Sequence, residues 1–257
     1  IVHASGAPLR SAGCQRQARR DWVRSALVSL NRQVMQFPEQ LIDGYRAFLV
    51  GRLRHEQDRY LGLAESGQSP RIMVIGCCDS RVSPEVIFDA RPGELFVVRN
   101  IGNLVPPYTP DGAQRAVSAA LEFAVQALKV KHIVVLGHAQ CGGIRAYVEE
   151  AAPLSPGDFI GHWMALIAPA AAEVGPRGDR ALGQYLTQLE QTSIVKTLDN
   201  LMTFPWIKTQ VGRGQLALHA AYFGVATGQL SVRDPGTGQF LQIAVDDHRR
   251  LFAQPRF

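Results

Sequence analysis

IMVIGCCDSR, residues 72–81, is the stretch of sequence that decides the fold. It begins as a short continuous apolar run, which is typical of a strand buried on both faces of a parallel sheet. Two similar runs follow at residues 95–98 and 133–136. Between them, residues 113–130 repeat apolar side chains at helical spacing, which predicts a strand–helix–strand unit. The sequence therefore predicts an α/β protein with a parallel sheet.

The flanking segments complete this prediction. Residues 37–66 have the apolar spacing of an amphipathic helix, and residues 67–70 (GQSP) end it. Further helices are expected over residues 144–150, 159–174, 180–203 and 206–211. Two β-rich runs, 216–225 and 230–232, resemble a hairpin. We expect one α/β domain over residues 35–257, with a mainly parallel central β-sheet flanked by helices, an N-terminal helical arm and a C-terminal β-hairpin edge.

The composition is that of a globular protein with a sizeable core. The chain has 257 residues, of which 46% are hydrophobic and 19% are charged. No apolar run is long enough for a membrane span, so we expect no membrane association. Residues 1–34 contain six Arg and one Asp, which account for the whole net charge of +5. The formally neutral remainder argues against a nucleic-acid partner.

Residues 1–34 form a basic segment that we expect to be poorly ordered. The segment lacks the apolar core of a secretory signal. Its Arg-rich, acid-poor character resembles a transit peptide. The alternative, which we favour, is a non-native or upstream-translated leader with Met35 as the natural start.

Four cysteines in the chain do not make a disulfide framework. We therefore expect a reducing compartment, the cytoplasm.

Chemistry-bearing side chains stand where two predicted strands end. Cys77 follows the first strand, and His138 and Cys141 follow the third. The carboxyl ends of parallel strands are where ligands bind in open α/β sheets. Two thiols and one imidazole are three zinc ligands, which leave the fourth position of a catalytic zinc open. Taken singly, each residue is more often an ordinary buried or surface residue.

The neighbours of Cys77 leave alternatives to an open site. Cys78 would close a structural zinc site, but adjacent residues of an extended segment point to opposite faces. Asp79 points the same way as Cys77 and could itself take the fourth position. Arg81 can prevent this, because a guanidinium pairs with a carboxylate through two hydrogen bonds. Asp79 would then accept a hydrogen bond from a zinc-bound water. A surface ion pair of little consequence is the alternative for these two residues.

Three segments carry a resemblance to a known family: VIGCCDSRVSPEVIF, ELFVVRNIGNLVPP and HIVVLGHAQCGGI. Their order and separations resemble those of the β-class carbonic anhydrases, in particular plant-like members, from about Met35 to the hairpin. The resemblance implies eight site residues: the zinc ligands Cys77, His138 and Cys141, the catalytic dyad Asp79 and Arg81, and the substrate-binding residues Gln68, Phe96 and Gly142.

The resemblance also implies an activity and an assembly. The activity is the zinc-dependent reversible hydration of CO2 to bicarbonate and a proton through a zinc-bound hydroxide, which is lyase chemistry. The assembly is a homodimer or a higher homo-oligomer with active sites at the dimer interface. One alternative is a carbonyl sulfide or carbon disulfide hydrolase on the same scaffold. The other is a zinc-binding protein without catalytic activity.

Overall fold

The structure is a computed structural model that describes residues 37–150 and 159–243. The expectations for residues 1–34 lie outside these described residues. The chain divides into two compact units, Ile1–Tyr60 and Leu61–Phe257. Within the described residues, no helix has both the length and the apolar character needed to cross a membrane.

The predicted helical arm is confirmed as two helices. These are α2 (Glu39–Val50) and α3 (Arg52–Ser66). Gly51 separates them with φ −103° and ψ −96°, which is outside the helical region. A Cβ at Gly51 would lie 2.9 Å from the carbonyl oxygen of Ala47, so this sharp break favours glycine. Neither helix has a buried residue.

Six strands form one sheet, which is mainly parallel, as predicted. In sheet order they are β2 (Leu95–Asn100), β1 (Ile72–Cys77), β3 (His132–His138), β4 (Ala217–Phe223), β5 (Leu230–Arg233) and β6 (Phe240–Gln242). The first four are parallel, and the last three form an antiparallel meander. The predicted hairpin edge therefore has a third strand, β6. Its three residues are too short a run to show a strand pattern in the sequence.

Helices cover the sheet, and their bounds refine the predictions. They are α4 (Pro84–Ile87), α5 (Ala116–Glu122), α6 (Gly142–Glu149), α7 (Phe159–Met164), α8 (Ala168–Val174), α9 (Leu182–Leu201) and α10 (Pro205–Gly212). The helix expected over residues 113–130 starts later and continues as a π-helical turn, Phe123–Ala127. The helix expected over residues 159–174 is interrupted by a 3-10 turn, Ala165–Ile167, before Pro169 occupies the first turn of α8.

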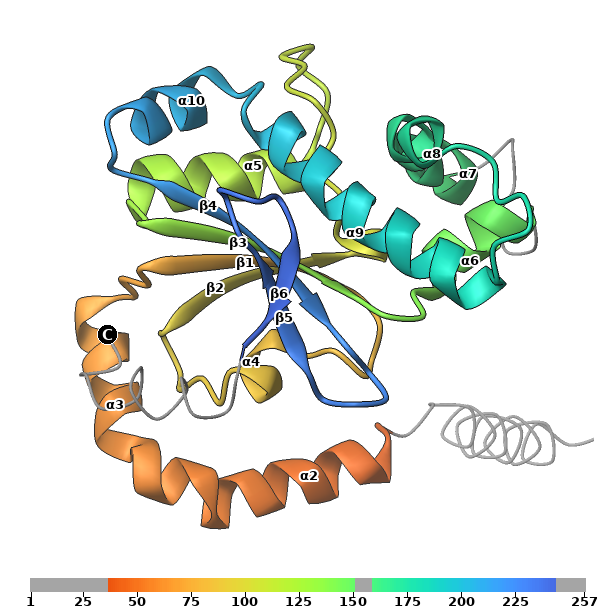
Figure 1. The fold of residues 1–257 in the computed structure, drawn as a ribbon. Helices are drawn as coiled ribbons and strands as arrows, with labels where there is room; N and C mark the ends of the chain where they lie inside the picture. The colour runs from red at the N-terminus through yellow and green to blue at the C-terminus, as the bar shows by residue number, and fades with distance from the viewer. Residues whose placement is uncertain (1–36, 151–158, 244–257) are drawn as a thin grey trace, which may run out of the picture. The chain divides into compact units, whose positions relative to one another are not determined.

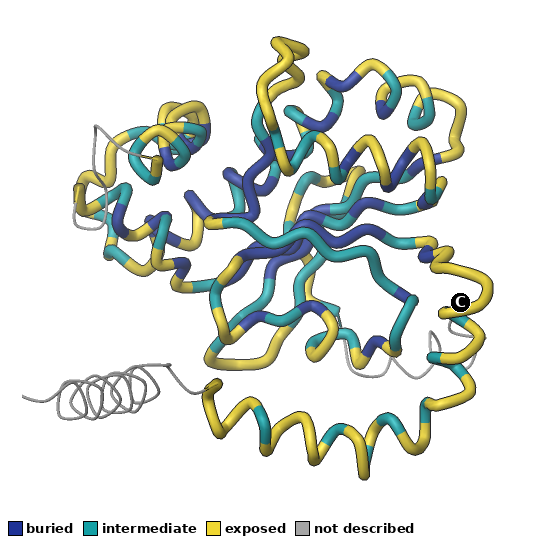
Figure 2. The backbone as a smooth tube through the Cα atoms, turned by 180° about the vertical axis from the view of Figure 1, so that it is seen from behind, coloured by how far each residue is buried: buried dark blue, intermediate teal, exposed yellow. Residues whose placement is uncertain are grey.

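The main core lies between the sheet and the helices α5, α9 and α10, which Figure 1 shows on one face of the strands. Alternate residues of β1 and β3, such as Ile75 and Ile133, pack there against Leu121 and Ile194. Figure 2 shows the central strands as mostly buried, and residues 73–77 of β1 and 135–138 of β3 are buried throughout. Burial on both faces fixes the register of β1 and β3, and this sets the positions of the side chains at their ends.

Candidate metal centre

The three predicted zinc ligands lie together at the carboxyl ends of β1 and β3. Cys77 is the last residue of β1, His138 is the last residue of β3, and Cys141 directly precedes α6. One ligand atom from each lies within 4.8 Å of the others, and all three residues are buried. Adjacent parallel pairing of the two strands, with Gly76 opposite Leu136, brings these residues to one point.

His138 has the tautomer that a metal ligand needs. Its Nδ1 lies 2.9 Å from the carbonyl oxygen of Ala139, and this acceptor requires the proton on Nδ1. The lone pair is then on Nε2, which is buried without a hydrogen-bond partner. A buried polar atom without a partner is costly, and a metal ion would satisfy it.

The two thiols also fit a divalent cation. Hydrogen bonding with Cys141 lowers the pKa of Cys77, even though burial opposes ionisation. The same interaction and burial raise the pKa of Cys141. The backbone N–H of Gly102 further stabilises the Cys77 thiolate, with N 3.4 Å from Sγ. A dication supplies the positive charge that allows both buried thiols to ionise. The donor set therefore fits zinc.

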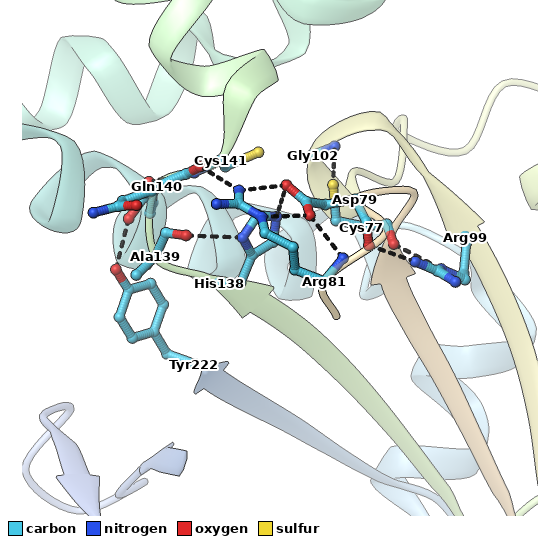
Figure 3. A network of polar contacts seen from close by, with 11 residues as sticks. Cys77, Asp79, Arg81, Arg99, Gly102, His138, Ala139, Gln140, Cys141 and Tyr222 are labelled. Carbon is cyan, nitrogen blue, oxygen red and sulfur yellow. Dashed lines mark hydrogen bonds and ion pairs between the residues drawn. The ribbon is translucent and has the colours of Figure 1, made fainter. Parts of the chain in front are cut away.

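Asp79 and Arg81 form a bidentate ion pair beside this cluster (Figure 3). Arg81 donates from Nε to Oδ1 at 2.9 Å and from Nη2 to Oδ2 at 2.6 Å, and its backbone N–H also donates to Oδ1. These hydrogen bonds hold the pKa of Asp79 well below its usual range. Arg81 Nη2 also donates to the carbonyl oxygen of Gln140, which joins the ends of β1 and β3. Asp79 Oδ2 lies 4.0 Å from His138 Nε2.

Cys78 is exposed and lies outside the cluster of three ligand residues. This arrangement agrees with the alternation argued from the extended chain. Its backbone N–H donates to the carbonyl oxygen of Asn100 and continues the pairing of β1 with β2. Within the described residues, no fourth Cys, His, Asp or Glu side chain completes a closed site.

Arg99 on β2 is a site residue that sequence reasoning missed. It donates from Nε to the carbonyl oxygen of Cys77 and from Nη2 to that of Asp79, both at 2.7 Å (Figure 3). One guanidinium thus holds the backbone on both sides of Cys78. The sequence did offer a signal, because Arg99 follows four apolar residues of the predicted strand. Which groups its side chain contacts, however, depends on the neighbouring strand β1.

Glu190 on α9 is the second residue that sequence reasoning missed. It is 2% exposed, accepts the backbone N–H of Cys141 at 2.9 Å and accepts the hydroxyl of Tyr222 at 2.6 Å. Burial raises the pKa of this carboxyl. Helical periodicity could have found it, because Glu190 lies on the buried stripe of α9 between Leu186 and Ile194.

Of the three other predicted site residues, Gly142 lies beside the ligand cluster of its own chain, whereas Phe96 and Gln68 do not. Gly142 adjoins Cys141 at the start of α6. Phe96 pairs with Met73, whereas Cys77 pairs with Asn100. Along β2, Phe96 thus lies four residues, or about 13 Å, from Asn100, the residue that pairs with Cys77. Gln68 precedes β1, and the strand extends about 16 Å from Ile72 to Cys77.

Comparisons with known proteins agree on one family. The family model for carbonic anhydrase matches residues 72–230. Beta carbonic anhydrase 5, chloroplastic, of Arabidopsis thaliana is 36% identical over 180 residues, or 70% of this chain, and the chain spans 59% of that relative's length. Beta carbonic anhydrase 3 of the same plant is 32% identical over 205 residues, or 79% of each protein.

The fold gives the same result. The solved structure of the beta-carbonic anhydrase CcaA superimposes with a TM-score of 0.74 at 29% identity, covering 80% of this chain and 92% of that chain. The chain therefore belongs to the β-class carbonic anhydrases, zinc enzymes that reversibly hydrate CO2.

Proposed function

We propose that this protein hydrates CO2 with a zinc ion held by Cys77, His138 and Cys141. The observation that carries the proposal is the buried Nε2 of His138, which lacks a hydrogen-bond partner and faces two buried thiols. When bound by three protein ligands, zinc supplies a Lewis acid that lowers the pKa of a coordinated water towards neutrality.

Asp79 serves as the hydrogen-bond acceptor that orients the attacking water. Its carboxylate stays ionised because Arg81 donates to both of its oxygens. The same two bonds restrain the carboxylate from turning into the ligand set, so the site stays open. CO2 is small and uncharged, and therefore needs little more than an apolar approach to this point.

The zinc assignment is tested with two neighbouring cysteines. We expect Cys77→Ser to lose zinc and CO2 hydration together, because it removes a thiolate from the ligand set. Cys78→Ser is the matched control, since Cys78 is exposed and outside the cluster, and it should keep both. Zinc content by mass spectrometry and hydration by stopped flow measure the two effects. Equal zinc content in both variants would contradict the assignment.

The same zinc-loaded sample decides between substrates. Carbonyl sulfide and carbon disulfide require the same metal chemistry and differ in size and access. We expect CO2 hydration to be the fastest reaction. Faster turnover of either sulfur substrate, with little CO2 hydration, would contradict this assignment.

We further propose a homodimer built on the edge strand β2, with active sites shared between protomers. β2 lies at one end of the sheet, and all six of its residues are only half-buried. A hollow of about 1090 Å³ adjoins it, with Val98, Ile101, Trp163 and Leu166 among its lining. An unprotected apolar edge of this kind is suited to pairing with another chain.

A two-fold axis at this edge would explain the positions of Gln68 and Phe96. Two copies of β2 related by such an axis run antiparallel, so the beginning of one strand lies beside the end of the other. Phe96 of one protomer would then approach the ligand cluster of its partner. Gln68, which precedes the start of the neighbouring strand β1, would approach the same cluster. Gly142 would line the site from its own protomer.

Mixing two inactive variants tests this sharing. A heterodimer of Asp79→Asn and Gln68→Leu protomers contains one site that carries both substitutions and one that carries neither. We therefore expect activity to return on mixing after subunit exchange. If each protomer had its own complete site, mixing would restore nothing, and the shared site would be wrong.

We propose the cytoplasm as the compartment. Cys77, Cys78 and Cys141 are free thiols, which supports a reducing environment. The plant relative named as chloroplastic offers the contrasting location, the plastid. Fractionation of the source cells with an antibody to the full chain tests this, and recovery in an organelle fraction would contradict it.

A further inference from the structure

Two histidines lie in contact at the end of the sheet opposite the metal centre. His132 begins β3, and His219 lies in β4 next to Val134 in the parallel register. Each lies two residues from Val134 or Ala221 along its strand, so the pair shares with them the second face of the sheet. The strands that carry them are neighbours in Figure 1. Six residues, about 20 Å of strand, separate His132 from His138.

The geometry of the pair suits a metal chelate. Nδ1 of His132 lies 3.1 Å from Nε2 of His219, and the ring centroids are 5.3 Å apart. An ion bound to both nitrogens at about 2.05 Å would subtend an angle of about 98° at the metal. This value lies between the square or octahedral angle of about 90° and the tetrahedral angle of about 109°. The two nitrogens are therefore already at a separation that one ion can bridge.

The protonation state also favours a ligand role. Burial lowers the pKa of His219, and the neighbouring His132 adds to this effect. A neutral imidazole has one N–H donor and one nitrogen with a lone pair. Without an ion, the N–H of one ring therefore donates a hydrogen bond to the lone pair of the other. Both rings are half-buried, which leaves a path for solvent. Within the described residues, no third Cys, His, Asp or Glu joins the pair, and water would complete the coordination.

We propose that His132 and His219 form a second metal site, distinct from the zinc centre, for a divalent first-row transition cation such as Ni2+, Cu2+ or Zn2+. Imidazole nitrogen is a preferred ligand of these cations and a poor ligand of Mg2+ or Ca2+. The bound ion would link β3 to β4 at the end away from His138. Because it binds the folded pairing of two strands, it would raise the melting temperature.

The test uses the full chain loaded with one zinc per protomer and titrated with Ni2+ in a calorimeter. Ni2+ is the probe because, unlike Cu2+, it does not oxidise thiols. We expect a further equivalent of Ni2+ to bind and to raise the melting temperature. His219→Gln and His132→Gln should each weaken this binding at least tenfold, because each leaves a single imidazole. Neither should change the zinc content or CO2 hydration.

His55→Gln is the matched control, since His55 is an exposed histidine on α3. It should leave the further equivalent unchanged. Two results would overturn the proposal: zinc-loaded protein that binds no further Ni2+, or a further equivalent that persists with unchanged affinity in both His132→Gln and His219→Gln. The two single variants test the same site independently, and their zinc content reports whether each one folds.

Discussion

Replacing Arg99 by Met should destabilise the protein and slow catalysis, although Arg99 is not a proposed metal ligand. Its guanidinium makes two hydrogen bonds of 2.7 Å, to the carbonyl oxygens of Cys77 and Asp79. Hydrogen bonds from a charged donor contribute about 1.5–3 kcal/mol each, and the lower value applies at this half-buried position, where water can replace them. The loss of both gives about 3 kcal/mol, or roughly 6–12 °C in melting temperature for a domain of this size.

The assay is differential scanning calorimetry at matched zinc content, followed by stopped-flow hydration. Arg99→Lys is the control, because an ammonium can reach one carbonyl and should recover about half of the loss. We expect hydration by Arg99→Met to fall roughly 10- to 100-fold, since small displacements of a catalytic group have effects of this size. A melting temperature within about 2 °C of the parent, with an unchanged rate, would refute the role of Arg99.

Three further predictions concern packing and pH. Gly137→Ala should destabilise by about 1–3 kcal/mol in urea unfolding, because its Cβ would lie 2.4 Å from Ile194 Cδ1. Gly183→Ala in α9 meets no atom and should stabilise by about 0.5–1 kcal/mol; a loss of stability there would contradict the helix assignment. Burial, together with His132, lowers the pKa of His219, so the unfolded chain binds more protons and stability should fall as pH drops below about 6.5. His219→Gln should reduce this slope, and an unchanged slope in melting temperature against pH would contradict its assignment.

The strands and the cluster of three ligand residues could be predicted because the sequence patterns that indicate them are local. An apolar run such as residues 72–76 is short, buried on both faces and followed directly by Cys77, so its end is fixed by the sequence itself. Once β1 and β3 are parallel neighbours, Cys77 and His138 must meet at one edge. The helical spacing of apolar residues likewise predicted a helix over residues 180–203, where the structure has α9 (Leu182–Leu201).

What the sequence could not predict depends on contacts between distant segments. Arg99 supports the site only because β2 lies beside β1, and Glu190 only because α9 crosses behind Cys141. The single helical arm expected over residues 37–66 is divided at Gly51, where the backbone leaves the helical region. Apolar spacing alone does not reveal such a break. Gln68 precedes the start of β1, whereas Cys77 ends that strand, and its role is a prediction that requires a second protomer.

Stopped-flow CO2 hydration by zinc-loaded parent protein and Asp79→Asn, from about pH 6.5 to about pH 9, tests the central claim most directly. The claim is that an Asp79 carboxylate, held ionised by Arg81, serves hydration at the Cys77, His138 and Cys141 centre. We predict fast hydration by the parent and a rate at least about 100-fold lower in Asp79→Asn at equal zinc content. Equal rates in the two proteins, or no hydration by the zinc-loaded parent at any pH, would contradict the claim.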